Sequence, residues 1–341
     1  MKLRKLVLPL IGLFMVLSSC NNDDDSPSTV PPRDKGEVYE EDLAEIEEFL
    51  STHFFNYEDF DFNNPDNPDN DTFEIVFDTI AGVNSDKISL MDSPQLEYKI
   101  VEDSGIDYKL YYLNVRQGGG NEIHFCDEAK LIYEGSITTG HVFDSAVNPA
   151  SFNLITVGSS AGVVPGFQQG VIEFKTSTSF TDNGDGTVTY HGHGIGAVFI
   201  PSGLGYFQQP LIGVPSYTPL IFKFDLYERT LLDHDGDNIY SYLEDLNMNG
   251  DLFDDDTDGD FGPNFIDNED DGDGYFTADE LGYNTYVVDT NMGETEPVLA
   301  GNEYEMSRTE ENGIITIETF VMLDRTGDGT PDFLDVNTIP E

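Results

Sequence analysis

The chain has 341 residues and a formal net charge of −51 at pH 7, and 38% of its residues are hydrophobic. This hydrophobic share, which includes 24 Phe and 17 Tyr, is sufficient for a folded core, and the length allows two or three domains. The charge excludes nucleic acid as a partner, because phosphate is bound by cationic side chains, and it favours divalent cations or simple solubility.

The N-terminus carries three cations, a short apolar run and the sequence "LSSC". The run is too short to cross a bilayer, so residues 1–19 are expected to be a secretion signal. The "LSSC" ending resembles the lipobox of bacterial lipoproteins, which implies a lipid on Cys20 and an outer-membrane lipoprotein facing the periplasm or the surface. The alternative is an ordinary cleaved signal with an incidental cysteine.

Residues 20–37 are polar and acidic and show no apolar periodicity, which predicts a flexible tether. The "NNDDD" stretch that follows Cys20 resembles the export signal of surface lipoproteins in Bacteroidetes-type bacteria. A solvated spacer is the alternative, and it leaves the periplasmic face open.

Residues 38–120 are expected to form an N-terminal extension with a helix and strands. Apolar residues at helical spacing predict the helix: Leu43, Ile46, Leu50 and Phe54. The turn-rich residues 63–71 end it, and alternating apolar residues predict strands over 73–80 and 107–115. These strands can continue the sheet of the next region.

Residues 121–229 alternate in short apolar stretches, with one short helical segment over 166–174. This pattern predicts an α+β fold in which an antiparallel sheet wraps over a single helix. Within "GVVPGFQQGV", Pro165 and Gly166 predict a sharp bend, after which Phe167 begins a new element. Cys126 is expected to be a small buried residue rather than a reactive thiol.

Four stretches in this region resemble, in order, the motifs of FKBP-type peptidyl-prolyl isomerases. They are "LIYEGSITTGHVFDSA", "SFNLITVGSSAGVVPGFQQGV", "AVFIPSGLGYF" and "GVPSYTPLIFKFDL". The resemblance implies the FKBP fold over residues 121–229 and one apolar pocket that binds a substrate proline. The residues carried over by motif are Tyr133, Phe143, Asp144, Phe152, Val163, Val164, Phe167, Tyr206, Val214 and Phe222.

The resemblance also assigns roles within this pocket. Phe167 becomes the floor, Tyr206 donates its hydroxyl to a substrate carbonyl, Asp144 orients polar contacts, and the Val164 amide is a further donor. Rotation about an X-Pro bond needs no cofactor, because an apolar site can favour the twisted amide over the planar, charge-separated one. If these aromatic residues are instead plain core, the pocket does not exist.

The chain departs from the FKBP pattern at several positions. Phe167 stands where many members have Trp, and Phe207 stands where the family usually has Gly after the tyrosine. A long insertion before Ala197 predicts a hairpin, on which His191 and His193 are expected to be exposed strand residues, with a metal pair as the alternative. Pro219 is expected to interrupt the strand of Phe222.

Residues 230–285 lack Lys and Arg and repeat the spacing of EF-hand-type calcium loops. They resemble the calcium-binding repeats of thrombospondin type 3, and a further acidic loop lies near the C-terminus. The expected ligands are Asp233, Asp235, Asp237, the Ile239 carbonyl, Ser241, Glu244, Asp245, Asn247, Asn249, Asp251, Asp256, Glu269, Asp271, Asp273, Glu280, Asp324, Asp328, Asp332 and Asp335.

Carboxylates in such number repel one another without a cation, so we expect structural Ca²⁺ here. Asn238 replaces the usual Gly at the sixth loop position, where Asn tolerates a positive φ. A solvated acidic tail is the alternative, but regularly spaced apolar residues argue against disorder. Residues 286–341 include a final alternating strand at 313–323 and have no assigned purpose.

Three functions remain open at this point. The first is a membrane-anchored isomerase that assists the folding of exported, proline-containing polypeptides, as in the FKBP lipoproteins of gliding bacteria that the layout resembles. The second is a module of the same fold that binds unfolded chains or a partner without turnover. The third is a calcium-stiffened surface or adhesion protein in which the FKBP-like block is a scaffold.

Overall fold

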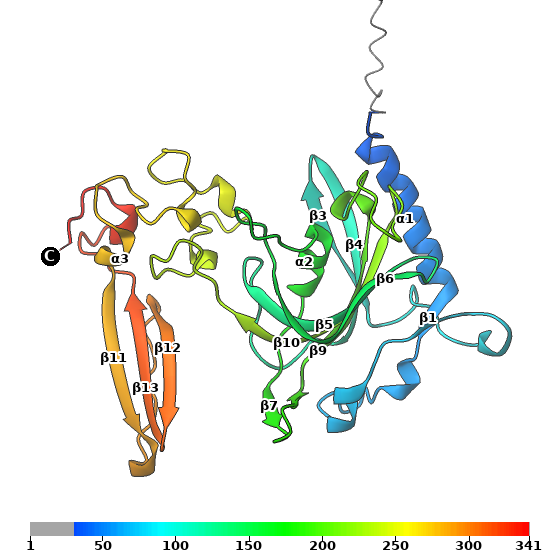
Figure 1. The fold of residues 1–341 in the computed structure, drawn as a ribbon, viewed down its shortest axis with the longest axis horizontal. Helices are drawn as coiled ribbons and strands as arrows, with labels where there is room; N and C mark the ends of the chain where they lie inside the picture. Colours follow the sequence, from blue (N-terminus) through cyan, green and yellow to red (C-terminus); the bar gives the residue numbers. More distant parts are fainter. Residues whose placement is uncertain (1–30, 341) are drawn as a thin grey trace, which may run out of the picture. The chain divides into compact units, whose positions relative to one another are not determined.

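The computed structural model describes residues 31–340. The predicted signal peptide (1–19) and Cys20 lie outside the described residues, as does most of the predicted tether. Asp34–Glu341 form one compact unit with mixed secondary structure, antiparallel sheets and few helices (Figure 1). Within the described range, no helix combines the length and the apolarity that a bilayer crossing requires.

Helix α1 (Lys35–Thr52) begins earlier than the sequence pattern predicts. The Asp34 carboxylate accepts a hydrogen bond from the Glu37 amide at 3.0 Å, which caps the helix and makes the end of the predicted tether helical. The helix ends before Phe54, which lies in strand β1 (His53–Phe55) and pairs with strand β2 (Phe77–Thr79). The strand predicted to begin at Phe73 is therefore confined to β2, because residues 68–72 form a 3₁₀ turn.

A six-stranded antiparallel sheet forms the centre of the fold, in the order β3-β4-β9-β10-β5-β6 (Figure 1). Two of its strands come from the N-terminal extension, so the expectation that the extension continues the sheet is confirmed. The strands are β3 (Leu96–Asp103), β4 (Ile106–Arg116), β5 (Glu128–Ile137), β6 (Val142–Asn153), β9 (Gly194–Ile200) and β10 (Leu220–Thr230). Because β10 begins at Leu220, Pro219 precedes the strand rather than interrupting it.

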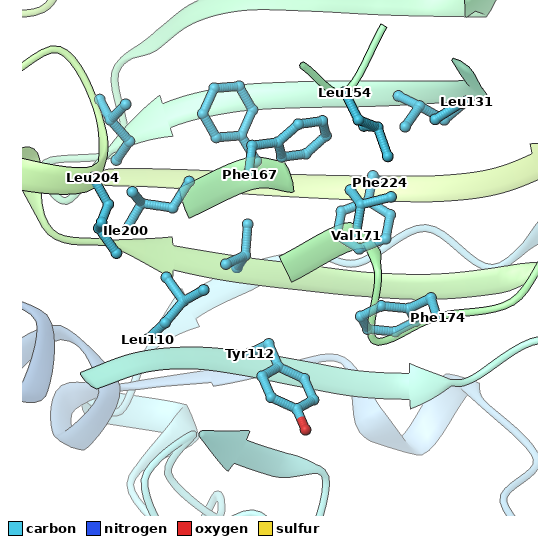
Figure 2. Packing of buried hydrophobic residues seen from close by; sticks show 14 of the residues in the cluster. Leu110, Tyr112, Leu131, Leu154, Phe167, Val171, Phe174, Ile200, Leu204 and Phe224 are labelled. Carbon is cyan, nitrogen blue, oxygen red and sulfur yellow. The ribbon is translucent and has the colours of Figure 1, made fainter. Parts of the chain in front are cut away.

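Both faces of this sheet are covered by apolar residues, so successive residues of the central strands enter different cores. In β9, Val198 and Ile200 face one core while Ala197 and Phe199 face the other, and all seven residues of the strand are buried. The first core also contains residues of helix α2 (Pro165–Val171). Figure 2 shows part of this core, including Phe167 and Val171 of the helix. The second contains Ile46, Phe49 and Leu50 of α1.

Helix α2 lies directly on β9 because two glycines face the sheet. A Cβ at Gly166 would lie 2.3 Å from Ile200, and one at Gly170 would lie 2.7 Å from Val198. The predicted bend at Pro165-Gly166 is thus a helix start, with Pro165 in the first turn after an extended Val164. Gly166 provides the close approach rather than the turn.

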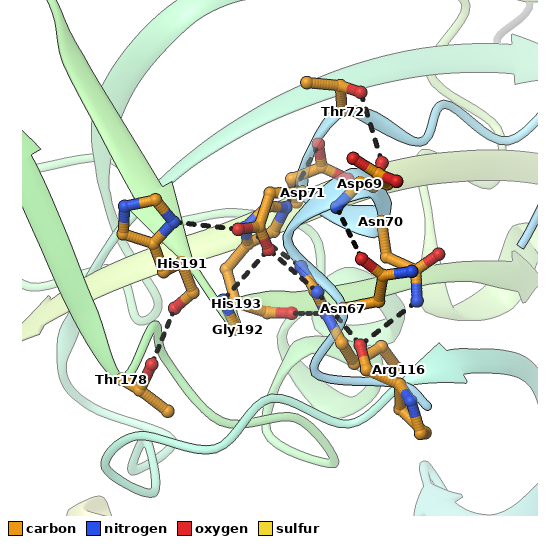
Figure 3. A network of polar contacts seen from close by, with 12 residues as sticks. Asn67, Asp69, Asn70, Asp71, Thr72, Arg116, Thr178, His191, Gly192 and His193 are labelled. Atoms are coloured by element: carbon orange, nitrogen blue, oxygen red, sulfur yellow. Dashed lines mark hydrogen bonds and ion pairs between the residues drawn. The ribbon is translucent and has the colours of Figure 1, made fainter. Parts of the chain in front are cut away.

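The insertion before β9 forms the predicted hairpin of β7 (Ser179–Asp182) and β8 (Val188–His191), but its histidines are not exposed strand residues. His193 is 1% exposed and lies beside Arg116, whose Nε donates to the His193 carbonyl at 2.7 Å. His191 Nδ1 lies 2.9 Å from Asp71 Oδ2, and Arg116 pairs with Asp71 at 2.9 Å (Figure 3). This buried ion pair holds the hairpin against the N-terminal extension.

The C-terminal region combines the acidic loops with a three-stranded antiparallel sheet in the order β11-β13-β12. Its elements are α3 (Thr277–Glu280), β11 (Gly282–Asp289), β12 (Glu303–Glu311) and β13 (Ile314–Val321). Leu252 and Phe265 of the acidic loops pack with Cys126, whose predicted burial is confirmed at 1% exposed. The acidic region therefore packs into apolar cores, one of which it shares with Cys126, and is not a disordered tail.

Candidate functional site

An apolar cavity of about 200 Å³ lies at one end of the first core. Its lining includes all of the residues carried over from the FKBP motifs except Phe143 and Val214: Tyr133, Asp144, Phe152, Val163, Val164, Phe167, Tyr206 and Phe222. They come from β5, β6, the segment before α2, α2, the segment after β9, and β10. None of the lining residues belongs to the inserted β7–β8 hairpin.

The aromatic rings of the cavity pack against one another at the spacings that favour ring contacts. Phe167 and Phe222 have ring centroids 4.9 Å apart, and Tyr133 meets Phe152 edge to face at 5.4 Å. Phe167 and Phe222 are 4% and 6% exposed, so these two rings form the buried floor. The floor is fixed by core packing before any ligand binds.

The two tyrosines of the cavity differ in how their hydroxyls are used. The Tyr133 hydroxyl donates to Asp144 Oδ2 at 2.6 Å, and burial together with this bond raises the pKa of Tyr133. Burial and the nearby Asp144 also raise the pKa of Tyr206. Within residues 31–340, however, the Tyr206 hydroxyl has no hydrogen-bond partner, so it is the donor left for a ligand.

Phe143 and Val214 are not among the residues that line the cavity. Phe143 meets Phe222 edge to face at 5.6 Å, so it packs against one ring of the floor. Val214 is 1% exposed and belongs to the first core. Phe207, where the resembled family has Gly, keeps a glycine-like backbone with φ 48°.

Gly162 also lines the cavity and was not singled out in the sequence. Its amide donates to Thr156 Oγ1 at 2.9 Å, and a Cβ there would lie 2.3 Å from the Ile155 carbonyl carbon. Only glycine therefore lets the segment before Val163 fold back this closely. The sequence offered one indication of this role, because Gly162 directly precedes Val163 and Val164, which line the cavity.

Four loops of residues 230–285 and the further loop near the C-terminus have the same backbone pattern. They begin at Asp233, Asp245, Asp256, Glu269 and Asp324. In each loop the first carboxylate accepts from the amide five residues later: Asn238, Gly250, Phe261, Gly274 and Gly329. All five of these residues have a positive φ, including 79° at Asn238 as predicted. The carboxylates thus shape the loops, and the repeat is regular even where glycine is absent.

The sequence spacing placed Asp256 at the end of the preceding loop, and the structure also makes it the first residue of a further loop. The carboxylates of Asp256, Asp258 and Asp260 gather within 4.8 Å of one another. Asp258 and Asp260 were missed because a ligand spacing read from Asp245 already used Asp256.

The ninth loop position does not present a free ligand. Ser241 Oγ accepts from the His234 amide at 3.2 Å and lies 2.8 Å from His234 Nδ1, so this side chain closes its own loop. Asp332 accepts from the Arg325 amide at 2.7 Å and from Arg325 Nη1 at 2.8 Å. Each Asp332 oxygen therefore already accepts one hydrogen bond from Arg325.

In the last loop, Asp324 and Asp328 accept from backbone amides, and Asp335 accepts from Asn337 at 3.1 Å. In the second loop, Asn247 and Asn249 donate to Asp254 and Asp255, and Asn249 and Asp251 also accept backbone amides. In the structure, the expected ligands of these two loops therefore form hydrogen bonds that close the loops. Ile239 places its side chain in a core at 0% exposed.

The first loop differs because it brings buried carboxylates together with one from another loop. Asp233, Asp235 and Asp237 lie within 4.8 Å of one another, and so do Asp237, Glu244 and Asp270. Glu244, Asp237 and Asp270 are 0%, 1% and 2% exposed. Asp270 was missed because loop spacing gives no sign that a neighbouring loop supplies a ligand.

These buried carboxylates have oxygens that nothing in the described part of the chain satisfies. The unpartnered oxygens lie on Asp235, Asp237, Glu244, Asp255, Asp270, Asp271 and Glu280. Burial raises the pKa of Glu244 to about 11 and that of Asp270 to about 9, and Asp237 adds to both shifts. An uncompensated buried carboxylate is costly, and a hard divalent cation binds oxygen ligands of this kind, so the residues fit such an ion.

Comparisons with known proteins concern both regions. A family model described as "BamM C-terminal" matches residues 234–301, and a search of curated proteins gave no match. Among solved structures, a Pseudomonas syringae peptidyl-prolyl cis-trans isomerase is similar at 12% identity and TM-score 0.34, over 59% of this chain and 99% of that one.

Two further solved structures are similar over part of their length. FkpA from Escherichia coli shares 24% identity at TM-score 0.29, over 38% of this chain and 51% of that one. The three FKBP domains of wheat FKBP73 share 16% identity at TM-score 0.29, over 39% of this chain and 51% of that one. The chain therefore spans about half of these two structures.

Proposed function

We propose that the chain is a peptidyl-prolyl cis-trans isomerase of the FKBP type whose active site is the apolar cavity. The observation that carries this proposal is the closed aromatic floor of Phe167 and Phe222 with one free hydroxyl, that of Tyr206, at the cavity. A volume of about 200 Å³ suits one small ring rather than a drug-sized ligand. A proline side chain is a small, rigid ring of this kind.

The chemistry requires only binding that is tighter when the amide is twisted. Rotation about an X-Pro bond meets a barrier of roughly 18–20 kcal/mol, because resonance gives the C–N bond double-bond character. Apolar walls disfavour the charge-separated planar form, and a donor such as Tyr206 holds the bound substrate in place through a backbone carbonyl. Each ~1.4 kcal/mol gained in the twisted state over the planar one gives a tenfold rate increase.

The test is the rate of cis-to-trans conversion of an X-Pro tetrapeptide by the chain from Asp34 onward. We expect acceleration over the uncatalysed rate, and Phe152→Ala should lower kcat/KM because it removes a wall of the cavity. Tyr98→Phe is the control, since Tyr98 is 59% exposed and lies outside the cavity. A folded protein that binds unfolded polypeptide without any acceleration would favour the binding-module alternative.

A second proposal concerns the acidic loops, which we propose bind structural Ca²⁺. It rests on the unpartnered oxygens of Asp237, Glu244 and Asp270, since a second loop contributes to one buried cluster. An ion held there would neutralise these carboxylates and link the first loop to the one that begins at Glu269. Terbium luminescence and calorimetry on the same chain test this proposal.

Glu244→Gln should weaken Ca²⁺ binding at least tenfold, because it removes a buried anionic ligand. Glu310→Gln, an exposed glutamate on β12, is the matched control. Equal binding by both variants, or no binding at millimolar Ca²⁺, would contradict the proposal.

The place of action remains a proposal that rests on the N-terminal sequence. A lipid on Cys20 would hold the isomerase at the outer membrane, where exported, proline-containing polypeptides are its clients. Incorporation of labelled palmitate into the full chain, and its loss in Cys20→Ala, would test the anchor. A calcium-stiffened adhesion protein is the alternative if surface attachment depends on Ca²⁺ and not on isomerase activity.

A further inference from the structure

Helix α1 reaches the segment that carries Tyr206 through a buried pair of hydrogen bonds. Asp42 Oδ2 accepts from the Ser202 amide at 2.7 Å and from the Ser202 hydroxyl at 2.6 Å. Asp42 is 2% exposed and Ser202 is 0% exposed. Hydrogen bonds to a carboxylate are stronger than neutral ones, and a site without water strengthens them further.

Ser202 also hydrogen-bonds both chain neighbours of Tyr206. It begins the 3₁₀ turn Ser202–Leu204 that follows β9. Its carbonyl accepts from the Gly205 amide at 3.0 Å and from the Phe207 amide at 2.9 Å. Ser202 therefore binds the helix with its amide and hydroxyl, and it fixes the backbone on either side of Tyr206 with its carbonyl.

A second contact between α1 and this segment lies two helical turns before Asp42. Lys35 Nζ lies 6.0 Å from the centroid of the Phe207 ring. Phe207 has φ 48°, a left-handed conformation that is strained for a non-glycine residue and persists only where its surroundings hold it. Its carbonyl accepts from the Tyr217 amide, which closes the loop at 2.6 Å.

We propose that Asp42 and Ser202 are positioning residues of the cavity: through them, helix α1 holds Tyr206 where its hydroxyl can meet a bound substrate. The N-terminal extension is then part of the catalytic unit. This inference rests on the proposed isomerase function for its effect on turnover, whereas its effect on the order of the 202–217 segment does not depend on that function.

The protonation state of Asp42 gives the proposal a distinctive pH dependence. Burial raises the pKa of Asp42 to about 6, against the lowering effect of the Ser202 bonds and with a further rise from Glu45 and Glu41 on the same helix. From β4, Tyr108 faces this group with a buried hydroxyl that has no hydrogen-bond partner among the described residues. A protonated Asp42 is the weaker acceptor, so its hold on Ser202 loosens as pH falls through about 6.

Stability responds to the same titration with the opposite sign. Because the pKa of Asp42 is about 6 in the folded chain and 3.8 ordinarily, the folded state binds the proton more tightly between these values. Acidification through this window therefore stabilises the fold through Asp42 while it weakens the hold on Tyr206. A merely structural role would make activity and stability fall together.

The test compares Asp42→Asn and Ser202→Ala with the control Glu48→Gln, an exposed position on the same helix. Hydrogen exchange of the Gly205 and Phe207 amides and kcat/KM for an X-Pro tetrapeptide are measured from pH 5 to 8. We expect about tenfold faster exchange and about three- to tenfold lower kcat/KM in both variants at pH 7.5. Below pH 6, kcat/KM of the wild type should fall towards the value of Asp42→Asn. The kcat/KM of Asp42→Asn should not change with pH in this range.

The proposal would be overturned if both variants had the same amide exchange rates and the same kcat/KM as the wild type. If the wild-type chain shows no isomerase activity, the proposed function fails, and amide exchange alone then decides whether Asp42 orders the segment. If Asp42→Asn does not fold, Ser202→Ala decides, since it removes only the hydroxyl bond and keeps the amide bond.

Discussion

The apolar cavity and the acidic loops are built in opposite ways. The cavity has its walls in place without a ligand: its rings pack on one another, and the Tyr133 hydroxyl is satisfied by Asp144. The first acidic loop buries Glu244 beside Asp270 of a neighbouring loop, and the carboxylate oxygens of both residues are unpartnered within residues 31–340. One region is preorganised for an uncharged ring, and the other is electrostatically incomplete without a cation.

This difference separates what each region requires. The proposed isomerase activity needs no ion, because its energy would come from apolar packing and one donor. A buried carboxylate cluster gains its stability when an ion replaces the lost hydration. Conditions that disturb one region should therefore leave the other largely unchanged, and the predictions below test that separation.

The largest effect is expected from removal of Ca²⁺. A site whose Kd for Ca²⁺ is a thousandfold below the free concentration adds about 4 kcal/mol, which corresponds to a Tm shift of roughly 15–30 °C for a region of about 100 residues. Scanning calorimetry in millimolar Ca²⁺ and in chelator should show this shift in the transition of the acidic region. Identical scans in the two conditions would contradict the account of the loops.

A buried carboxylate that has its own cation should behave differently. Asp71 pairs with Arg116 at 2.9 Å, and both side chains are about 5% exposed or less. Asp71→Ala leaves that arginine buried and unpaired, so we expect a loss of about 3 kcal/mol in the free energy of unfolding. Urea titration should give the same loss with and without Ca²⁺. A calcium-dependent loss would mean that the two regions are coupled.

Asp42 is a third kind of buried carboxylate, with hydrogen-bond donors but no ion. Its pKa of about 6 against 3.8 means that the ionised form costs stability above pH 6 and that protonation recovers it at lower pH. Between pH 7.5 and 4.5 the wild type should therefore gain about 2 kcal/mol relative to Asp42→Asn. Urea titrations at the two pH values measure this difference, and parallel behaviour of the two proteins would show that Asp42 does not titrate as described.

The smallest effects are expected in the cavity, where single hydroxyls are removed. Tyr206→Phe should lower kcat/KM about tenfold, which corresponds to one hydrogen bond of ~1.4 kcal/mol made in the twisted state. Tyr133→Phe should have about a threefold effect, since its hydroxyl already serves Asp144. Neither effect should change with Ca²⁺. Equal losses in the two variants would remove the distinction between a free and a satisfied hydroxyl.

The sequence indicated the cavity more fully than the cation clusters, for a physical reason. The cavity residues occur in ordered motifs that resemble those of FKBP-type isomerases, and this resemblance implied one pocket for Phe167 and Phe222, whose ring centroids lie 4.9 Å apart. Asp270 meets Glu244 only because two loops fold together, and no local spacing records that contact. The burial of His193 depended likewise on Arg116 and Asp71, which are distant in sequence.

Local rules also failed where one residue could serve two structures. Asp256 fits the end of one loop and the start of the next, and the bond from the Phe261 amide to its carboxylate shows the second role, which the spacing did not reveal. Gly166 fits a bend as well as a helix face, and the close approach of Ile200 selects the helix. In both cases the deciding contact was tertiary.

The central claim is that the cavity catalyses cis-trans isomerisation of an X-Pro peptide bond. The most direct measurement is NMR exchange spectroscopy of cis and trans X-Pro tetrapeptide with catalytic amounts of the chain from Asp34 onward, in Ca²⁺ and in chelator. The account predicts accelerated exchange in both conditions and a roughly tenfold reduction by Tyr206→Phe. Exchange at the uncatalysed rate in the presence of the folded protein would contradict it.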